Sequence, residues 1–210
     1  MTEARERRAD GDQASGPPEP DSLTAKQSER RRRVLEAAMS LADEGGYEAV
    51  QMRDVAARAD VALGTLYRYF SSKDQLLAAV RAHWTSALEQ RLSRQPLQGD
   101  TRAERVIDFF VRATRPLERR RRLAEALVLS VATRDPHAAV YQQEVSSWMD
   151  RIVIDALCGL PEDEAHAIRG VLAHVWNSVL LAWVNGHMEP EQMYEILRSA
   201  CHLLLDHRES

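Results

Sequence analysis

Residues 51–70 read QMRDVAARADVALGTLYRYF and carry the strongest structural signal in the chain. Apolar residues recur there at helical spacing in two short runs, Met52 to Ala59 and Leu63 to Tyr69. The Asp60-Val61 segment between the runs is short enough for a tight turn. Two short helices joined in this way predict a helix-turn-helix, whose second helix fits the major groove of DNA.

The segments on either side are also predicted to be helical. Upstream, residues 34–42 carry an apolar stripe that ends at Gly45-Gly46, a C-cap signal. Downstream, Ser71-Ser72 supplies an N-cap for a helix that opens at Lys73. Prolines at positions 96, 116, 136, 161 and 190 divide the remainder into stretches of helical length, and none of these stretches alternates with a strand period. We therefore predict an all-α protein of about nine helices with a three-helix N-terminal head.

The composition restricts the ways in which this protein can bind nucleic acid. The 210 residues are 44% hydrophobic and 29% charged, which is typical of soluble globular domains. The formal net charge of −4 excludes binding through bulk positive charge. The charge is uneven, however, because residues 1–25 carry a net −3, residues 26–81 a net +2 and residues 82–210 a net −3. A small, mildly basic head remains compatible with DNA contacts.

The N-terminal segment, the cysteines and the lack of long apolar runs indicate the cellular compartment. Residues 1–25 combine prolines and glycines with almost no large apolar side chains, so we predict a disordered tail there. Cys158 and Cys201 are too few for a disulfide scaffold. The chain has no run of 18 apolar residues and no apolar N-terminal signal, so we expect a cytoplasmic protein with no transmembrane helix.

The sequence gives little evidence that the protein is an enzyme. The seven histidines form no HExxH pattern, and the cysteines lack zinc-site spacing. The chain also has no glycine-rich phosphate loop and no GxSxG elbow. We expect no enzyme activity, no metal site and no cofactor.

The residue string around the helix-turn-helix is more specific than the pattern itself. It resembles the DNA-binding domain of the TetR family of bacterial repressors over about 55 residues, from Arg30 to Trp84. The matching elements are RRVLEAA (32–38), GY (46–47), DVA (54–56), GTLYRYF (64–70) and SKDQLL (72–77). Two positions depart from the family pattern, since Asp60 replaces the usual turn glycine and Gln51 the usual Thr or Ser cap.

The string from Gly45 to Lys73 also resembles a subgroup, the cholesterol-catabolism repressors of mycolic-acid actinobacteria (the KstR type). The resemblance implies a homodimeric repressor that a small hydrophobic effector releases from a palindromic operator. A steroid or a steroid acyl-CoA is the effector that the subgroup implies. A regulator of drug efflux or of another lipid or fatty-acid pathway would carry the same head, so that alternative stays open. Residues 26–72 would be the DNA-binding domain, residues 73–95 a connecting helix, and residues 96–207 the ligand-binding and dimerisation domain.

The resemblance also implies which residues contact double-stranded DNA. Thr65 offers a hydroxyl and a methyl group to base edges, while Arg53 and Arg68 can reach bases or phosphates. Tyr67, Tyr69 and Lys73 are expected at phosphates. The expected DNA-binding residues are Gln51, Arg53, Leu63, Gly64, Thr65, Tyr67, Arg68, Tyr69 and Lys73.

The basic stretch KQSERRRR (26–33) precedes this motif. It either grips the DNA backbone or minor groove or forms a solvated charge run.

Residues 171–184 (VLAHVWNSVLLAWV) predict a helix that is buried on most sides. Eleven of the fourteen residues are apolar. One side would face the core and the other a second subunit, which a palindromic operator independently requires. The alternative is that residues 162–184 and 190–206 serve only the monomer core. The expected interface residues are Val175, Val179, Leu180, Trp183, Met193, Ile196, Leu197, Ala200 and Leu204.

The effector cavity is expected among apolar residues of the C-terminal half. Its candidate wall consists of Phe109, Phe110, Leu127, Val128, Val131, Trp148, Ile152, Trp176 and Asn177. Asn177 would orient a polar ligand group or be satisfied within a packed core. Arg119–Arg122 would bind acyl-CoA phosphates or form a solvated face. Effector binding would move the helix that opens at Lys73, and a 100-fold preference for the released state corresponds to roughly 2.7 kcal/mol of coupling.

Overall fold

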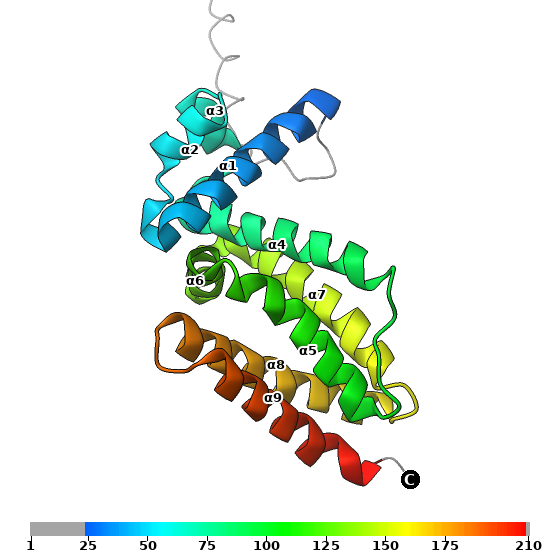
Figure 1. Ribbon diagram of the computed structural model, residues 1–210. Helices are drawn as coiled ribbons and strands as arrows, with labels where there is room; N and C mark the ends of the chain where they lie inside the picture. Colours follow the sequence, from blue (N-terminus) through cyan, green and yellow to red (C-terminus); the bar gives the residue numbers. More distant parts are fainter. Residues whose placement is uncertain (1–23, 209–210) are drawn as a thin grey trace, which may run out of the picture.

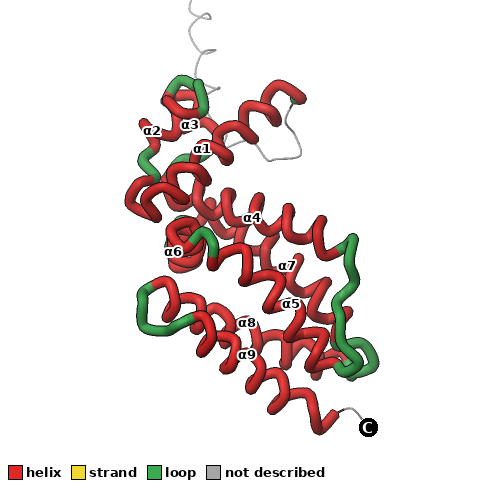
Figure 2. Tube along the Cα trace, viewed as in Figure 1, coloured by secondary structure: helices red, strands yellow, loops and turns green. Residues whose placement is uncertain are grey.

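The computed structural model describes residues 24–208, and the predicted tail lies almost entirely outside this range. Within it, all regular structure is helical (Figure 2), which confirms the all-α prediction. The α-helices are α1 (Ala25–Ala49), α2 (Met52–Arg58), α3 (Leu63–Tyr69), α4 (Lys73–Leu92), α5 (Arg102–Glu118), α6 (Arg121–Leu129), α7 (Ala139–Ala156), α8 (Glu162–Val184) and α9 (Pro190–Leu205). Short 3₁₀ turns cover Ser130–Ala132, Pro136–Ala138 and Asp206–Arg208.

The first three helices form a compact head at one end of the molecule (Figure 1). α1 begins with a capping box, in which Thr24 and Gln27 satisfy each other's backbone N–H groups. The helix breaks at Gly45 and Gly46, where Gly46 has φ +71°. The turn between α2 and α3 places Asp60 at φ +53°, a left-handed conformation that Asp tolerates better than most residues. The predicted helix-turn-helix is therefore present, and Asp takes the role of the usual turn glycine.

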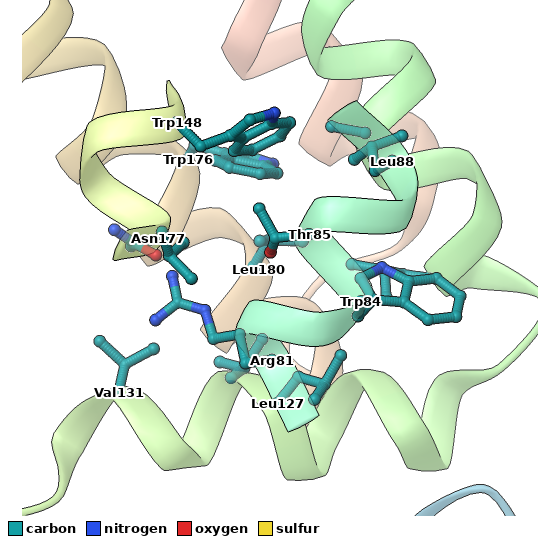
Figure 3. Close-up of a pocket in the computed structure, with 14 residues that line it drawn as sticks. Arg81, Trp84, Thr85, Leu88, Leu127, Val131, Trp148, Trp176, Asn177 and Leu180 are labelled. Carbon is teal, nitrogen blue, oxygen red and sulfur yellow. The ribbon is translucent and has the colours of Figure 1, made fainter. Parts of the chain in front are cut away.

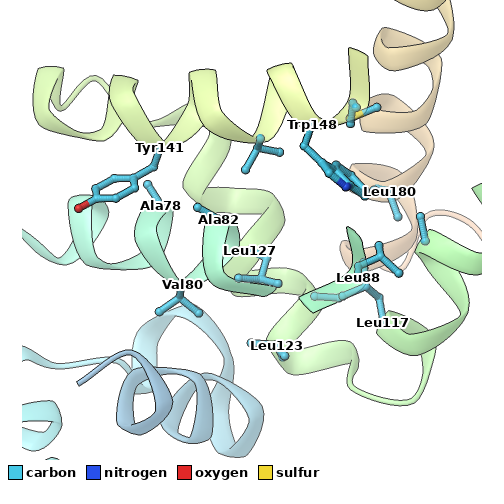
Figure 4. Close-up of a cluster of buried hydrophobic side chains, with 14 of the residues drawn as sticks. Ala78, Val80, Ala82, Leu88, Leu117, Leu123, Leu127, Tyr141, Trp148 and Leu180 are labelled. Atoms are coloured by element: carbon cyan, nitrogen blue, oxygen red, sulfur yellow. The ribbon is translucent and has the colours of Figure 1, made fainter. Parts of the chain in front are cut away.

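α4 connects the head to the rest of the molecule. Ser72 caps it as expected, because its Oγ accepts a hydrogen bond of 3.0 Å from the backbone N–H of Gln75. Most of the first half of α4 is buried, and Ala78, Val80 and Ala82 lie in the apolar cluster of Figure 4. The same cluster receives Leu127 from α6. α4 is thus a core element shared by both halves and not only a linker.

The remaining helices form the body of the molecule, with α8 and α9 at the end farthest from the head (Figure 1). Among the described residues, α8 is the one helix with the length and composition of a membrane span. It contacts α6, α7 and α9 and buries Trp176, Leu180 and Trp183 in the core, so packing within the monomer accounts for part of its apolar character.

The prolines behave as helix starters at three of the five positions. Pro136 follows the N-cap Asp135, whose Oδ1 accepts a hydrogen bond from the backbone N–H of His137, and Pro190 opens α9. Pro161 is itself the N-cap of α8. Pro116 differs from the expectation, since it lies inside the last turn of α5. The helix continues past Pro116 and ends two residues later, at Glu118.

Candidate functional site

The first turn and outer face of α3 form an exposed surface on the head. Leu63 is 37% and Tyr67 48% exposed, and Gly64 and Arg68 are also exposed. Thr65 is partly exposed beside them. An added Cβ at Gly64 would meet no atom within 4 Å, so packing inside the head does not require glycine there. The surface is therefore free for a partner.

Tyr69 requires a correction to the sequence-based expectation. Only 5% of this residue is exposed, because it lies three residues after the fully buried Leu66 on the same face of α3. Its ring centroid lies 6.5 Å from that of Phe70 in the core. Tyr69 therefore holds α3 in place and has little surface with which to meet a phosphate.

Two further expected DNA-contacting residues lie at the start of α2 and are exposed. Arg53 has no hydrogen-bonding partner or ion-pair partner within residues 24–208. Gln51 is the N-cap residue but makes no side-chain cap, as its departure from the family pattern suggested. Its Nε2 instead donates a hydrogen bond of 2.9 Å to the carbonyl oxygen of Glu48.

Lys73 lies at the junction of the head and α4. Its Nζ lies 3.8 Å from the centre of the Tyr47 ring and 3.9 Å from Glu48 Oε2. Partial burial lowers the pKa of this ammonium group, while the neighbouring carboxylates of Glu48 and Asp74 oppose the shift. The side chain is 20% exposed, so it can still reach an anion at the surface.

The basic stretch 26–33 lies within α1 and is partly occupied by internal contacts. Arg32 pairs with Glu29 and Glu36 on the same helix. The guanidinium of Arg31 lies 5.6 Å from the centre of the Phe70 ring and donates a 3.3 Å hydrogen bond to the hydroxyl of Tyr141 on α7. Arg31 therefore connects the head to the body.

A polar cluster joins the segment between α6 and α7 to the start of α4. Asp74 accepts hydrogen bonds from the hydroxyls of Tyr47 (2.6 Å) and Thr133 (3.0 Å). Ser72 donates a hydrogen bond to Asp135. The hydrogen bond to Asp74 is the main cause that raises the pKa of Tyr47 to about 12. We call Tyr47, Ser72, Asp74, Thr133 and Asp135 the junction cluster.

An apolar pocket of about 50 Å³ lies in the body (Figure 3). Of the nine residues expected at the effector cavity, six line it: Leu127, Val128, Val131, Trp148, Trp176 and Asn177. Its other lining residues are Arg81, Trp84, Thr85, Leu88, Ala113, Leu117, Val145 and Leu180. Four of these belong to α4, which the sequence analysis treated as a connecting helix.

Phe109, Phe110 and Ile152 do not line this pocket. The two phenylalanines are fully buried behind it, and the Phe109 ring centroid lies 5.7 Å from Trp148 and 6.0 Å from Trp176. They support the indole walls and do not form the surface. The Nε1 of Trp176 donates a 3.0 Å hydrogen bond to the hydroxyl of the buried Thr114, which fixes that ring.

A larger groove of about 510 Å³ adjoins the pocket and shares Trp84 and Leu88 with it. Five arginines line the groove and no acidic residue does: Arg91, Arg112, Arg115, Arg119 and Arg120. Arg112 and Arg120 pair with Asp108 and Asp43, respectively. The other three are exposed and form no ion pair within the described residues. The groove thus presents positive charge beside an apolar pocket.

The arginine run 119–122 does not form a single site. Arg119 and Arg120 line the groove. Arg121 donates a 3.1 Å hydrogen bond to the carbonyl oxygen of Trp183, and Arg122 donates to the carbonyl oxygen of Glu44. The second pair therefore ties α6 to α8 and to α1.

The residues expected at a subunit interface fall into two groups. Val179, Leu180, Trp183, Met193 and Leu197 are buried within the monomer, so the isolated chain already uses them. Val175, Ala200 and Leu204 are partly exposed, and Ile196 is 40% exposed. Further exposed apolar residues on these helices were not among the expected interface residues, namely Val171, Leu181 and Leu203, the last 74% exposed. Together the second group and these three residues form an apolar face on α8 and α9.

Residues 24–208 contain no cluster of three or more His, Cys, Asp or Glu side chains that could hold a metal ion.

Comparison with known proteins identifies both halves of the chain. Residues 34–80 match the family model of bacterial regulatory proteins, tetR family, and residues 99–204 match the tetracyclin repressor-like C-terminal domain. The chain is similar to the HTH-type transcriptional repressor KstR of Mycobacterium tuberculosis, with 37% identity over 185 residues. That alignment covers 88% of this chain and 84% of the relative.

Solved structures show the same architecture. A TetR transcriptional regulator from Rhodococcus sp. RHA1 superposes with a TM-score of 0.75 at 33% identity, covering 85% of this chain and 97% of that one. The FadR repressor of Thermus thermophilus, solved with lauroyl-CoA, shares the fold with a TM-score of 0.67 at 21% identity over 83% and 92% of the two chains. The protein described here belongs to the tetR family of bacterial transcriptional regulators.

Proposed function

We propose that this protein is a homodimeric repressor whose α3 reads operator DNA and which a hydrophobic, anionic effector releases. The exposed start of α3 carries the first part, because Leu63, Gly64 and Thr65 leave its backbone and small side chains open to base edges. Arg53 and Arg68 flank this turn with free positive charge. In this proposal residues 26–72 read DNA, residues 73–95 connect, and residues 96–207 bind effector and the second subunit.

Substitution of Arg53 tests the assignment of base reading. On duplexes that the wild-type protein selects from a random library, Arg53→Ala should weaken binding roughly tenfold or more and relax the preference for one base pair. Arg94→Ala is the matched control, since Arg94 is exposed just beyond the far end of α4. Unchanged affinity and base preference in Arg53→Ala would remove Arg53 from the reading surface.

The apolar face on α8 and α9 supports the dimer. One three-helix head spans only a few base pairs, so specificity requires two heads on a twofold-symmetric site. Residues such as Leu203 and Ile196 are costly to leave in water and would be buried by pairing α8 and α9 with the same helices of a second subunit. Leu203→Glu should give a folded monomer in light scattering, whereas Leu203→Met should remain dimeric.

The charge of the groove restricts the chemistry of the effector. Exposed arginines beside an apolar pocket suit a ligand with a hydrophobic body and an anionic end. The lauroyl-CoA bound to the Thermus protein supports an acyl-CoA. We propose a steroid acyl-CoA, which is the effector that the resemblance to KstR-type repressors implies. The positive groove disfavours the cationic drugs expected for an efflux regulator.

The small size of the pocket supports ligand-linked release. Pockets for drug-sized ligands usually measure about 300–1,000 Å³, far above the roughly 50 Å³ found here. A steroid body must therefore displace wall residues such as Val131. Val131 lies two residues before Thr133, whose hydroxyl binds Asp74 at the start of α4. Expansion of the pocket would be transmitted through the junction cluster to α4 and thereby change the spacing of the two heads.

A release assay tests the effector. A steroid carboxylic acid converted to its CoA thioester should dissociate the protein from a fluorescent operator, and the free steroid alcohol should do so much less effectively. Arg119→Glu should raise the concentration needed for release, because it reverses one groove charge. Release by cationic dyes with no response to any CoA thioester would favour the efflux alternative.

The proposal includes a cytoplasmic location and no catalytic role. Its support is that the chain belongs to a family of DNA-binding regulators. Hydrolysis of the steroid CoA thioester by the purified protein would contradict this part.

A further inference from the structure

Arg81 is an unusual residue in the wall of the apolar pocket. It lies on α4, two turns after Lys73, and its lining neighbours include no acidic side chain. Within residues 24–208 its guanidinium has no hydrogen-bonding partner and no ion pair. Burial lowers its pKa to about 10, with no carboxylate opposing the shift. The side chain as a whole is partly exposed, so the charge is not sealed from water, and no ion pair among the described residues explains its place in this apolar wall.

A second polar group of the wall is also unmatched. The indole Nε1 of Trp148 is buried with no acceptor among the described residues. Like the guanidinium of Arg81, it is a donor only. Figure 3 shows the Arg81 guanidinium extending to the side of the pocket where Asn177 lies. The guanidinium of Arg81 is thus a donor-only group in the pocket wall, and a ligand that supplies an acceptor could pair with it.

We propose that Arg81 binds an oxygen acceptor at one end of the hydrophobic effector, as a specificity-determining residue of the pocket. This inference rests on the proposed effector function of the same cavity. The acceptor is a carbonyl or carboxylate oxygen, because these groups accept the parallel hydrogen bonds that a guanidinium offers. A ligand that is purely hydrocarbon at this end leaves Arg81 unpaired.

The position of Arg81 along α4 separates this contact from the arginine groove. Arg91 of the groove lies ten residues after Arg81, a rise of about 15 Å along the helix. Trp84 and Leu88 lie between them and line both cavities. The effector would therefore carry two polar ends, one acceptor at Arg81 and one anionic group at the groove, with its apolar body across Trp84 and Leu88.

Matched ligands test the inference without DNA. Three of the four tryptophans line the pocket, so quenching of tryptophan fluorescence reports binding. One pair is androst-4-en-3-one and androst-4-ene, which differ in the ketone. The other is decanoate and 1-decanol, which differ in the carboxylate. The member with the acceptor should bind about tenfold or more tightly in at least one pair, and which pair responds identifies the ketone or the carboxylate as the source.

Variants of Arg81 supply the second arm. Arg81→Met should abolish this discrimination while preserving the melting temperature of the free protein, since it removes a partly exposed charge that has no ion pair among the described residues. Arg94→Met is the control and should retain the discrimination. Arg81→Lys keeps the charge but loses the planar fork, so it should retain part of the effect even where Arg81→Met fails to fold.

Two results would overturn the inference. Equal binding of both members in both pairs by the wild-type protein would show that no acceptor is recognised. Discrimination that survives in Arg81→Met would assign recognition to another group. Neither result bears on DNA binding, which is measured separately, so failure here is distinguishable from failure of the repressor proposal.

Discussion

At the scale of single residues, Asp60 shows how a departure from the family pattern is accommodated. The turn between α2 and α3 needs a left-handed residue, and Asp60 supplies it at φ +53° without glycine. Asp and Asn tolerate this region better than other side chains because they can hydrogen-bond locally. This tolerance of Asp predicted that the turn is feasible without glycine, and the structure confirms it.

Substitutions at Asp60 test this explanation. Asp60→Ala should lower the free energy of unfolding by about 1 kcal/mol, because alanine adopts the left-handed conformation less readily than Asp. Asp60→Gly should be close to neutral, since glycine adopts this φ freely but loses more entropy on folding. Urea denaturation followed by circular dichroism measures both. A larger loss in Asp60→Gly than in Asp60→Ala would contradict the explanation.

At the scale of elements, the start of α3 contains a glycine that packing within the head does not explain. Gly64 has an open Cβ position, so nothing within the head requires glycine. Glycine in a helix is less stable than alanine by roughly 0.5–1 kcal/mol. We propose that glycine at this position allows close approach of the α3 backbone to DNA.

Gly64→Ala should therefore raise stability by about 0.5–1 kcal/mol while weakening operator binding. Thermal unfolding and fluorescence anisotropy measure the two effects on the same sample. Arg94→Ala serves as the control for affinity. A variant that gains stability and keeps full affinity would show that the backbone at residue 64 does not approach DNA closely.

The junction cluster makes a prediction about communication between the effector pocket and α4. Thr133→Val removes the 3.0 Å hydrogen bond to Asp74 but keeps the shape of the side chain. The variant should bind operator with nearly unchanged affinity and need several-fold more effector for release, because the pocket is then less well coupled to α4. Thr133→Ser, which keeps the hydroxyl, should behave as the wild-type protein. Equal effector response in Thr133→Val and wild type would remove this route.

At the scale of the whole molecule, the sequence predicted the helical architecture well and the distribution of roles less well. The bounds of α3 and the cap at Ser72 followed from local patterns, which depend on neighbouring residues. The pocket-lining residues of α4 could not be predicted in this way, because the same apolar spacing occurs in helices that face a packed core and in helices that face a cavity. The family resemblance implied that Tyr69 contacts a phosphate, whereas its spacing of three residues from the buried Leu66 places it on the core-facing side of α3.

Apolar periodicity alone also does not predict which residues of α8 and α9 would meet a second subunit. Apolar spacing on α8 and α9 identified buried positions such as Trp183 and Leu197 as interface residues, yet they complete the monomer core. The exposed residues Val171 and Leu203 belong to neighbouring stripes of the same helices. A helix that is apolar on several faces does not tell from sequence which face meets which partner.

The most direct test of the central claim is the selection of duplexes from a random double-stranded DNA library by the purified protein, followed by sequencing. The account predicts one enriched motif with twofold symmetry, whose half-sites are separated by a fixed spacing that matches two heads. It also predicts that Arg53→Ala loses preference at one position in each half-site. Enrichment of no motif, or of a single asymmetric half-site by a monomer, would contradict the account.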